Sequence, residues 1–183
     1  MSGRSPAGPL MHEHRVIERM LAVLARELAA AGTDGPVDSK VIDAGTDFIR
    51  TYADRCHHGK EEDILFRQLA SKNLDADIAA AMADLIADHV HGREMTHTLI
   101  EANRRYAEGD LSARSEVVAT TQALIDFYPV HIEKEDRHFF KASLEYFSDT
   151  EKSQMLRKFD EFDRALIHAV YLALVESLEQ AQL

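Results

Sequence analysis

The apolar residues of this chain recur at helical spacing along nearly its whole length. The first row, spaced alternately four and three residues apart, consists of Leu10, His14, Ile17, Leu21, Leu24 and Leu28. Such spacing places its members on one face of an α-helix. The alternation of apolar and polar residues that marks strands is missing, and only 4 prolines occur in 183 residues. The pattern therefore predicts an all-α fold.

Glycine and short polar residues interrupt the helical pattern at intervals of about 30 to 40 residues. The interruptions read AGTDGPVDS, SKNLDAD, AEGDLS and SDTE, and they separate expected helices near residues 9–31, 38–72, 75–108, 112–146 and 149–181. In the last interruption, Ser148 and Glu151 have the spacing of a helix-capping box. Helices of this length with short connections indicate an antiparallel up-down four-helix bundle with an additional C-terminal helix.

We expect one domain in three parts. Residues 1–8 are expected to form a flexible N-terminal tail, residues 9–147 the bundle, and residues 148–183 the C-terminal helix. The apolar face of that last helix consists of Met155, Phe159, Phe162, Leu166 and Ala169. A face of this kind needs a surface to bury against. Packing on the bundle is favoured, and a homodimer contact is the alternative.

The composition disfavours several classes of partner. Acidic residues outnumber basic ones by 32 to 21, without a dense Lys/Arg block, so nucleic acid is disfavoured. No run of about 18 apolar residues occurs, which disfavours a membrane-spanning helix. The first residues lack the apolar core of a signal peptide, which disfavours export. The single cysteine, Cys56, excludes an internal disulfide and suits a reducing compartment. We therefore expect a cytoplasmic protein.

Histidines and a glutamate interrupt the apolar rows. His14 belongs to the first row, and His89 continues the row of the third helix four residues after Leu85. In the fourth helix, His131 and Glu135 keep the same spacing. All four of these polar residues are therefore expected to face the interior of the bundle.

The second helix contains two overlapping His-x-x-x-Glu pairs within the stretch CHHGKEED. One pair is His57 with Glu61, and the other is His58 with Glu62. The apolar row before the stretch ends at Cys56 and points nearer to His57 than to His58 by about one 100° step. The pair His57/Glu61 is therefore favoured as the inward pair, with His58 and Glu62 as the alternative.

Counting residues from the helix ends places these inward groups at one level of the bundle. The set consists of His14, His57, Glu61, His89, His131 and Glu135. A single histidine in an apolar row is more often a hydrogen-bonded core residue than a ligand. Six ionisable groups in an apolar core are costly without an ion, so a metal site is predicted. Nitrogen and oxygen donors in two His/Glu pairs favour a carboxylate-bridged pair of iron or manganese ions over structural zinc.

Four segments carry a family resemblance, in the order LMHEHRVIERML, CHHGKEEDILF, DHVHGREM and YPVHIEKEDRHFF. With them the chain resembles hemerythrin-like (HHE cation-binding) proteins over most of residues 10–147. The resemblance implies a non-haem di-iron centre in which Glu61 and Glu135 bridge the two irons. It also implies two histidines for each iron, and these pairs are His14 with His57 and His89 with His131.

The chain departs from the oxygen-carrying hemerythrins at two positions. Those proteins have a further ligand histidine four residues after the one matching His89, where this chain has Arg93, whose guanidinium cannot replace it. They also place the last carboxylate five residues after its histidine, which would select Asp136. Many hemerythrin-like proteins place it four residues after, which selects Glu135, and Asp136 lies off the inward row. Reversible oxygen carriage is therefore less expected.

Other residues are expected around the site. Tyr128, one turn before His131, could donate a hydrogen bond to the centre, and His138 continues the row one turn beyond Glu135. Residues in such positions are more often packing residues than ligands. Carboxylates that could orient ligand imidazoles are Glu62, Asp88 and Glu133. Histidines expected at or near the surface are His12, His91, His97 and His168.

The expected function is that of a non-haem di-iron protein that reacts with or senses dioxygen, nitric oxide or peroxide, or that holds iron. The alternatives are a di-iron peroxidase or oxidase, a factor that repairs iron–sulfur clusters, and an interaction bundle with a vestigial or zinc-filled site. The sequence shows no substrate pocket, so whether the chain is an enzyme stays open. Manganese and zinc are the other candidate metals.

Overall fold

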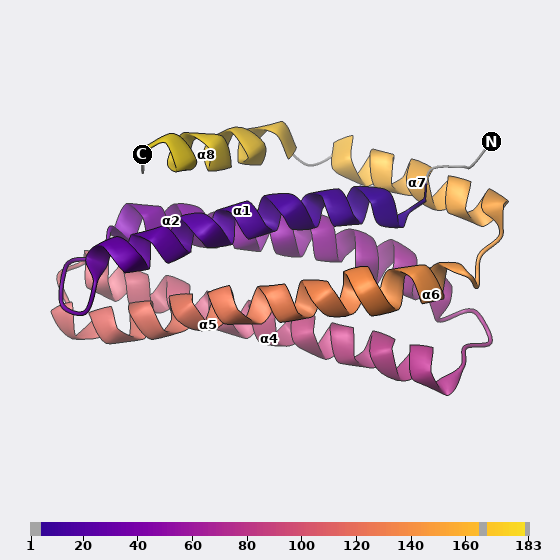
Figure 1. Ribbon diagram of the computed structural model, residues 1–183, viewed down its shortest axis with the longest axis horizontal. Coiled ribbons are helices and arrows are strands. Elements are labelled where there is room, and N and C mark those ends of the chain that lie inside the picture. The colour runs from indigo at the N-terminus through magenta and orange to yellow at the C-terminus, as the bar shows by residue number, and fades with distance from the viewer. Residues whose placement is uncertain (1–4, 165–167, 182–183) are drawn as a thin grey trace.

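The computed structural model describes residues 5–164 and 168–181 of the 183-residue chain. These described residues form helices and no strand, which confirms the all-α class. Long helical segments run side by side along the longest axis of the molecule, and two shorter helices lie along one side of them (Figure 1). Within the described ranges, no helix combines the length and apolar character needed to cross a membrane.

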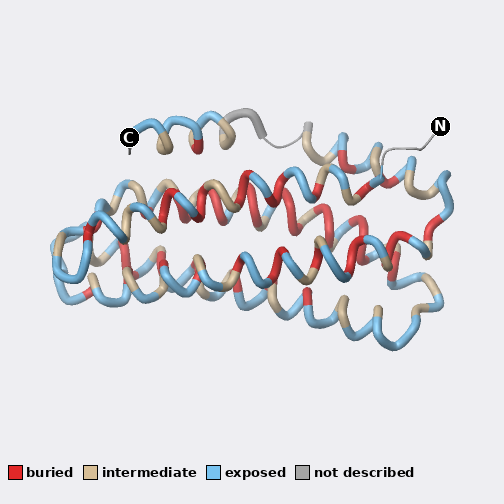
Figure 2. The backbone as a smooth tube through the Cα atoms, viewed as in Figure 1, coloured by how far each residue is buried: buried red, intermediate tan, exposed pale blue. Residues whose placement is uncertain are grey.

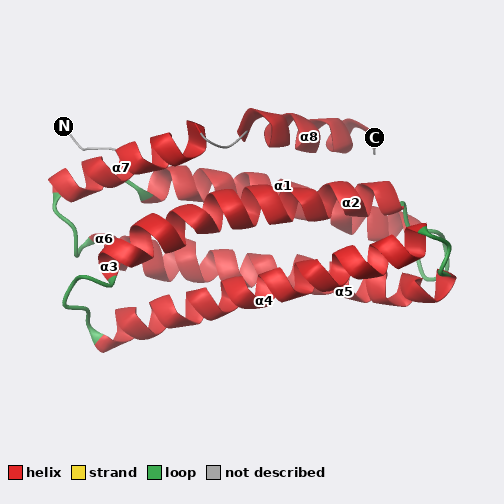
Figure 3. Ribbon diagram, turned by 180° about the vertical axis from the view of Figure 1, so that it is seen from behind, coloured by secondary structure: helices red, strands yellow, loops and turns green. Residues whose placement is uncertain are grey.

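The first long segment is α1, Ala7–Ala31. The second is built from α2 (Ser39–Phe48), the π-helical η1 (Ile49–His58) and η2 (Glu61–Phe66), and α3 (Arg67–Leu69). The third is α4, Ala76–Ala107. The fourth consists of the 3₁₀ turn η3 (Leu111–Ala113), α5 (Arg114–Glu133), the π-helical η4 (Lys134–Phe139) and α6 (Phe140–Leu144). The loops between these segments lie at alternating ends of the molecule (Figure 3).

The first helix begins earlier than the sequence pattern predicted. α1 includes Ala7 and Gly8, which were expected to belong to the flexible tail, and Pro6 stands at its N-cap. Proline is tolerated at the beginning of a helix because the first backbone N–H groups have no partner within the helix. Pro9 in this first turn therefore does not prevent the helix from beginning before it.

The final segment holds two described helices, α7 (Asp149–Arg164) and α8 (His168–Ala181), where one was expected. Residues 165–167 lie outside the described residues, and with them Leu166 of the predicted apolar face; the side chain of Ala169 is likewise not described. The capping box is confirmed, since the backbone N–H of Ser148 donates to Glu151 at 2.8 Å and the N–H of Glu151 donates back to the Ser148 hydroxyl at 3.3 Å.

The described parts of the C-terminal segment pack on the bundle. Met155 and Phe159 of α7 are buried in an apolar cluster with residues of the long segments. On α8, Tyr171 donates a hydrogen bond to Asp47 at 2.9 Å, and Glu179 accepts two from Arg19 at 3.0 and 2.7 Å. Packing on the bundle is thus the arrangement within one chain, and a homodimer contact stays a prediction.

The buried apolar residues form two clusters, and the buried histidines fall between them along the chain. In α1, for example, Leu10 belongs to one cluster and Val16 to the other, with His14 between them. Buried positions line the inner faces of the long segments (Figure 2). A buried polar layer therefore divides the core of the bundle.

The turns that carry the predicted glutamates are π-helical, in η2 and η4. Hydrogen bonds in a π-helix reach five residues back, so each turn holds one residue more than an α-helical turn. Such a turn shifts the inward row by one position for all residues that follow. Single π-turns within α-helices occur frequently at functional sites.

Candidate metal centre

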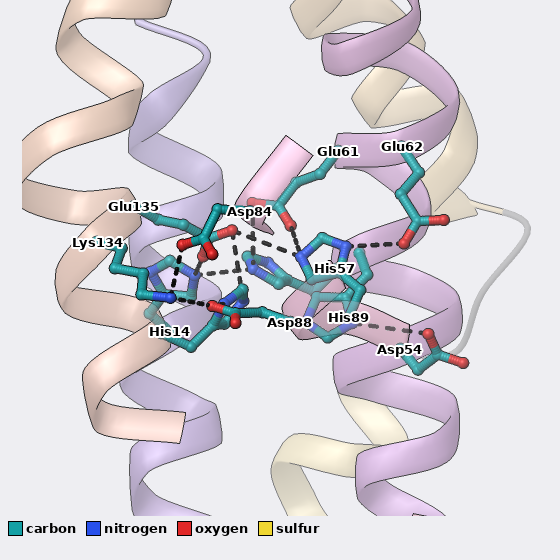
Figure 4. Close-up of polar contacts among 12 residues, drawn as sticks. His14, Asp54, His57, Glu61, Glu62, Asp84, Asp88, His89, Lys134 and Glu135 are labelled. Atoms are coloured by element: carbon teal, nitrogen blue, oxygen red, sulfur yellow. Dashed lines mark hydrogen bonds and ion pairs between the residues drawn. The ribbon is translucent and has the colours of Figure 1, made fainter. Parts of the chain in front are cut away.

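Each of the long helical segments contributes buried polar side chains to one layer of the bundle. None of them is more than 2% exposed, and they are His14, His57, His58, Glu61, His89, His131 and Glu135. Figure 4 shows His14, His57, Glu61, His89 and Glu135 directed toward one another from different helices. The structure thus brings together all six favoured residues and one of the alternatives, His58.

These side chains form two groups of donor atoms. The first group is His14, His57, Glu61 and Glu135, and the second is His58, His89 and His131. Within each group, one donor atom from every residue lies within 4.8 Å of the others. Either group could hold a metal ion.

The two glutamates of the first group also approach histidines of the second. Glu135 places Oε2 at 3.1 Å from Nε2 of His14 and Oε1 at 3.4 Å from Nε2 of His131. Glu61 likewise has Oε1 at 3.5 Å from Nε2 of His57 and Oε2 at 3.4 Å from Nε2 of His89. Each glutamate therefore presents one oxygen to each histidine group, as a bridging carboxylate would.

Several buried atoms at this point have no hydrogen-bond partner. They include both carboxylate oxygens of Glu61, both of Glu135, and Nε2 of His89 and of His131. A buried polar atom without a partner costs free energy. These atoms are the donors that iron, manganese or zinc accepts from proteins. The donor set therefore fits a pair of bound cations.

Proton positions follow from burial and from neighbouring charges. Burial raises the pKa of Glu61 well above its ordinary value, and the charge of Glu135 raises it further. Burial and the positive charge of His14 lower the pKa of His57 to about 4. Burial also opposes protonation of His14, but the hydrogen bond with Asp136 and the negative charge of Glu135 outweigh it and raise its pKa to about 10. Burial therefore favours the neutral form of Glu61, and the neighbouring carboxylates favour the protonated form of His14.

Carboxylates outside the centre orient the imidazoles. In four histidines, Nδ1 faces a carboxylate oxygen: His14 with Asp136 at 2.7 Å, His57 with Glu13 at 2.9 Å, His89 with Glu62 at 2.7 Å, and His131 with Asp88 at 3.2 Å. Such contacts hold the proton on Nδ1 and leave Nε2 for a metal. His58 has a longer contact, with Nδ1 at 3.6 Å from Asp54.

A family model of the hemerythrin HHE cation-binding domain matches residues 6–143. The chain belongs to the hemerythrin family. Among curated proteins it is similar to the uncharacterized proteins Rv1995 of Mycobacterium tuberculosis (strain H37Rv) and Mb2018 of Mycobacterium bovis. Each is 25% identical over 170 residues, covering 92% of this chain and 66% of the relative. The chain thus spans just under two thirds of these relatives' length. No solved structure matches it significantly.

Both overlapping His/Glu pairs of this hemerythrin-family chain contribute a histidine to the buried layer. His57 belongs to the first donor group and His58 to the second, whereas Glu62 turns outward to bond His89. The favoured pair, His57 and Glu61, and the alternative histidine, His58, all lie in the buried layer, so the two histidines do not exclude each other. Because η1 is π-helical, the angle between consecutive residues is smaller than in an α-helix, and both imidazoles reach the buried layer.

One expected neighbour, His138, lies elsewhere than predicted. His138 is exposed, so the expectation that it continues the inward row was wrong. The π-turn of η4 shifts that row, and Phe139 and Phe140 are buried in its place. Arg93 does not enter the centre, since its guanidinium bonds Asp54 at 2.7 Å and Glu62 at 2.6 Å.

The remaining predicted residues occupy varied positions. Asp136 reaches Nδ1 of His14 and not the donor groups. Tyr128 is 1% exposed and its ring lies 6.4 Å from that of His58. Cys56 is buried, and burial raises the pKa of its thiol.

Histidines on the exposed surface are His12, His91 and His97. The side chain of His168 lies outside the described part, and Glu133 pairs with Arg137 at 2.9 Å.

Sequence reasoning missed three residues next to the centre: Glu13, Asp54 and Lys60. Lys60 is fully buried, and its ammonium pairs with Glu13 and, at 2.7 Å, with Asp163 of α7. Asp54 could have been found, because it precedes His58 by four residues on one helix. The contact between Glu13 and His57 joins different helices, and no local spacing predicts it.

Proposed function

We propose that this chain is a non-haem di-iron protein of hemerythrin-like type, which reacts with or senses a small oxidant (dioxygen, nitric oxide or peroxide) or holds iron. The observation that supports it most directly is the position of Glu61 and Glu135. Their four carboxylate oxygens are buried, without hydrogen-bond partners, and divided between two histidine groups. Membership of a cation-binding family adds the expectation of a metal.

The proposed ligands are the members of the two donor groups. His14 and His57 would serve one ion, His58, His89 and His131 the other, and Glu61 and Glu135 both. A bound iron pair would supply the binding and redox chemistry for the small oxidant. His58 would be the third histidine ligand of the second ion. Position 93 cannot provide this ligand, because it is an arginine whose guanidinium is directed toward Asp54 and Glu62.

The protein's own part is to orient the donors, to exclude water and to move protons. Asp136 and Glu13 fix the imidazoles of His14 and His57 through Nδ1. Burial of the whole layer excludes bulk water from the centre. Burial favours the neutral form of Glu61 and nearby carboxylates favour the protonated form of His14, and protons held there must leave when a cation binds.

The proposal includes the antiparallel four-helix topology of the family, which the loops at alternating ends support (Figure 3). We further propose a cytoplasmic location, because the single cysteine cannot form a disulfide within the chain. The net charge of −11 supports the absence of a nucleic-acid partner. We also propose that the C-terminal segment can form a homodimer contact, in addition to packing on the bundle.

Anaerobic purification, metal quantification and an optical spectrum on exposure to air test the proposal. We expect close to two irons per chain, one for each donor group, and an absorption band that depends on the oxidant. Glu135→Ala should lose metal, whereas Glu133→Ala, an exposed carboxylate on the same helical segment, should keep it. Stoichiometric zinc with no oxidant-dependent absorption would contradict the proposal. Sustained turnover of peroxide would favour the peroxidase alternative over binding or sensing.

A further inference from the structure

A cavity of about 260 Å³ lies beside the three-histidine group, between η1 and α4. His58 and Tyr128 are part of its inner wall, and both side chains are buried. His97 and Glu101 line it where it meets the surface, and both are exposed. The cavity therefore extends from solvent to the edge of the proposed metal centre.

The interior of this cavity is mainly apolar. Gly92 leaves space there, since a Cβ at this position would lie 3.8 Å from the Tyr128 hydroxyl oxygen and 3.5 Å from the ring of Phe127. Ile49 and Ile100 add apolar wall. Thr96 uses its hydroxyl within its own helix, donating to the carbonyl of Gly92 at 2.7 Å. The surroundings suit a small apolar molecule.

One polar group in the wall is available to an occupant. The Tyr128 hydroxyl makes no hydrogen bond with any of the described residues. Tyr128 can therefore donate or accept one hydrogen bond at the inner end of the cavity.

The outer part of the cavity carries balanced charges. Its cationic residues are Arg50 and Arg93, and its anionic residues are Asp54 and Glu101. Arg93 is bonded to Asp54 and Glu62, and Arg50 to Asp47 at 3.0 Å. Because both arginines already pair with carboxylates, the cavity offers no excess of either charge to a ligand. A neutral occupant fits it best.

We propose that this cavity binds a small neutral aromatic molecule that carries a hydroxyl group, of which phenol is the simplest. A cavity of about 150 Å³ suffices for benzene in an engineered protein, so this one has room for a substituted ring. The ring of Tyr128 lies within 12° of parallel with that of His58, and His58 within 11° of His89, so flat faces line the route to the centre. Aromatic rings pack well against such faces in offset or edge contacts.

The occupant would lie next to His58, a proposed metal ligand. Its role as a second small molecule beside the metal centre therefore rests on the proposed function. Binding itself requires no metal. The test therefore measures phenol binding by titration calorimetry and saturation-transfer NMR, on the protein as purified and after its metal has been removed. Metal content is measured on the same samples.

Matched variants of two threonines on α4 locate the site. Thr96→Leu fills the cavity, while Thr98→Leu changes an exposed residue whose hydroxyl makes the same kind of bond, to the carbonyl of Glu94 at 3.0 Å. We expect Thr96→Leu to weaken phenol binding by about tenfold or more, and Thr98→Leu to leave it unchanged. Both variants should keep the metal content of the native chain.

Two further variants keep the test valid if Thr96→Leu folds poorly. Gly92→Ala adds a methyl group at ordinary contact distances and narrows the cavity, so it should weaken phenol binding severalfold. Tyr128→Phe removes the hydroxyl partner and should abolish the preference for phenol over benzene. Absence of phenol binding to the native chain at millimolar concentration would overturn the inference, as would equal binding to the two threonine variants or tighter binding of benzoate than of phenol.

The results separate the two proposals. Phenol binding in a chain that holds no iron would leave the cavity site in place and contradict the di-iron function. Two irons per chain without phenol binding would support the di-iron function and contradict the cavity site.

Discussion

A carboxylate oxygen of Glu13 lies 2.9 Å from Nδ1 of His57 in the interior of the bundle. The other oxygen pairs with the buried ammonium of Lys60, which also reaches Asp163 on α7. Glu13 thus fixes the orientation of one proposed ligand, and Lys60 balances the buried charge of Glu13. The metal centre and the packing of α7 share this ion pair.

Glu13→Gln should lower metal affinity by about 10- to 100-fold, because the amide keeps the shape of the side chain but loses the charge that holds the His57 proton. Metal retention during chelator challenge measures the effect. Glu18→Gln, on the same helix and paired with exposed Arg15 at 2.9 Å, is the control and should behave as the native chain. Equal retention in both variants would show that Glu13 does not act on the metal.

His58→Ala should lose about half of the bound metal, since His58 belongs to one of two donor groups. His57→Ala should lose metal from the other group. Elemental analysis of both purified variants measures this, with His12→Ala as an exposed control on α1. Full metal content in His58→Ala, with the helical circular dichroism intact, would exclude it as a ligand.

Arg93→Ala should speed the loss of metal to a chelator severalfold without lowering the initial metal content. Arg93 bonds Glu62, and Glu62 bonds Nδ1 of His89 at 2.7 Å, so the variant loosens the support of one ligand. Arg104→Ala removes an exposed arginine of the same helix, paired with Glu101 and Glu108, and is the control. Identical release rates for the two variants would contradict this role.

Metal uptake near neutral pH should release protons, about one or more per chain. The pKa of His14 is raised to about 10 in the metal-free centre, so its imidazole is protonated at any pH below that value. A metal ligand must be deprotonated, and affinity should therefore rise as pH rises toward 10. Calorimetry in buffers of different ionisation enthalpy measures the release. Uptake without proton release would mean that His14 is neutral before the metal binds.

Gly59→Ala should destabilise the fold by about 1–3 kcal/mol, because the new Cβ would meet the ring of Phe162 on α7 at 2.8 Å. Gly8→Ala is the control, since a Cβ there meets nothing within 4 Å, and it should stabilise α1 by about 0.5 kcal/mol. Urea denaturation of both variants gives the free energies of unfolding. A native-like value for Gly59→Ala would show that α7 shifts without cost.

Local spacing was enough to determine the helical class and most of the inward residues. His14, His89, His131 and Glu135 were identified from apolar rows because the helical period is a property of the chain itself. The capping contacts of Ser148 and Glu151 span only three residues, and they too could be predicted and are observed.

Tertiary structure decided which of the neighbouring polar residues take part. The π-turns of the second and fourth segments let His58 join His57 inside and move His138 to the surface, and a uniform 100° step cannot foresee a turn with an added residue. Glu13 approaches His57 only because two helices pack together, across 44 positions of sequence. Contacts of that kind depend on the register of one helix against another, which the period of either helix alone does not contain.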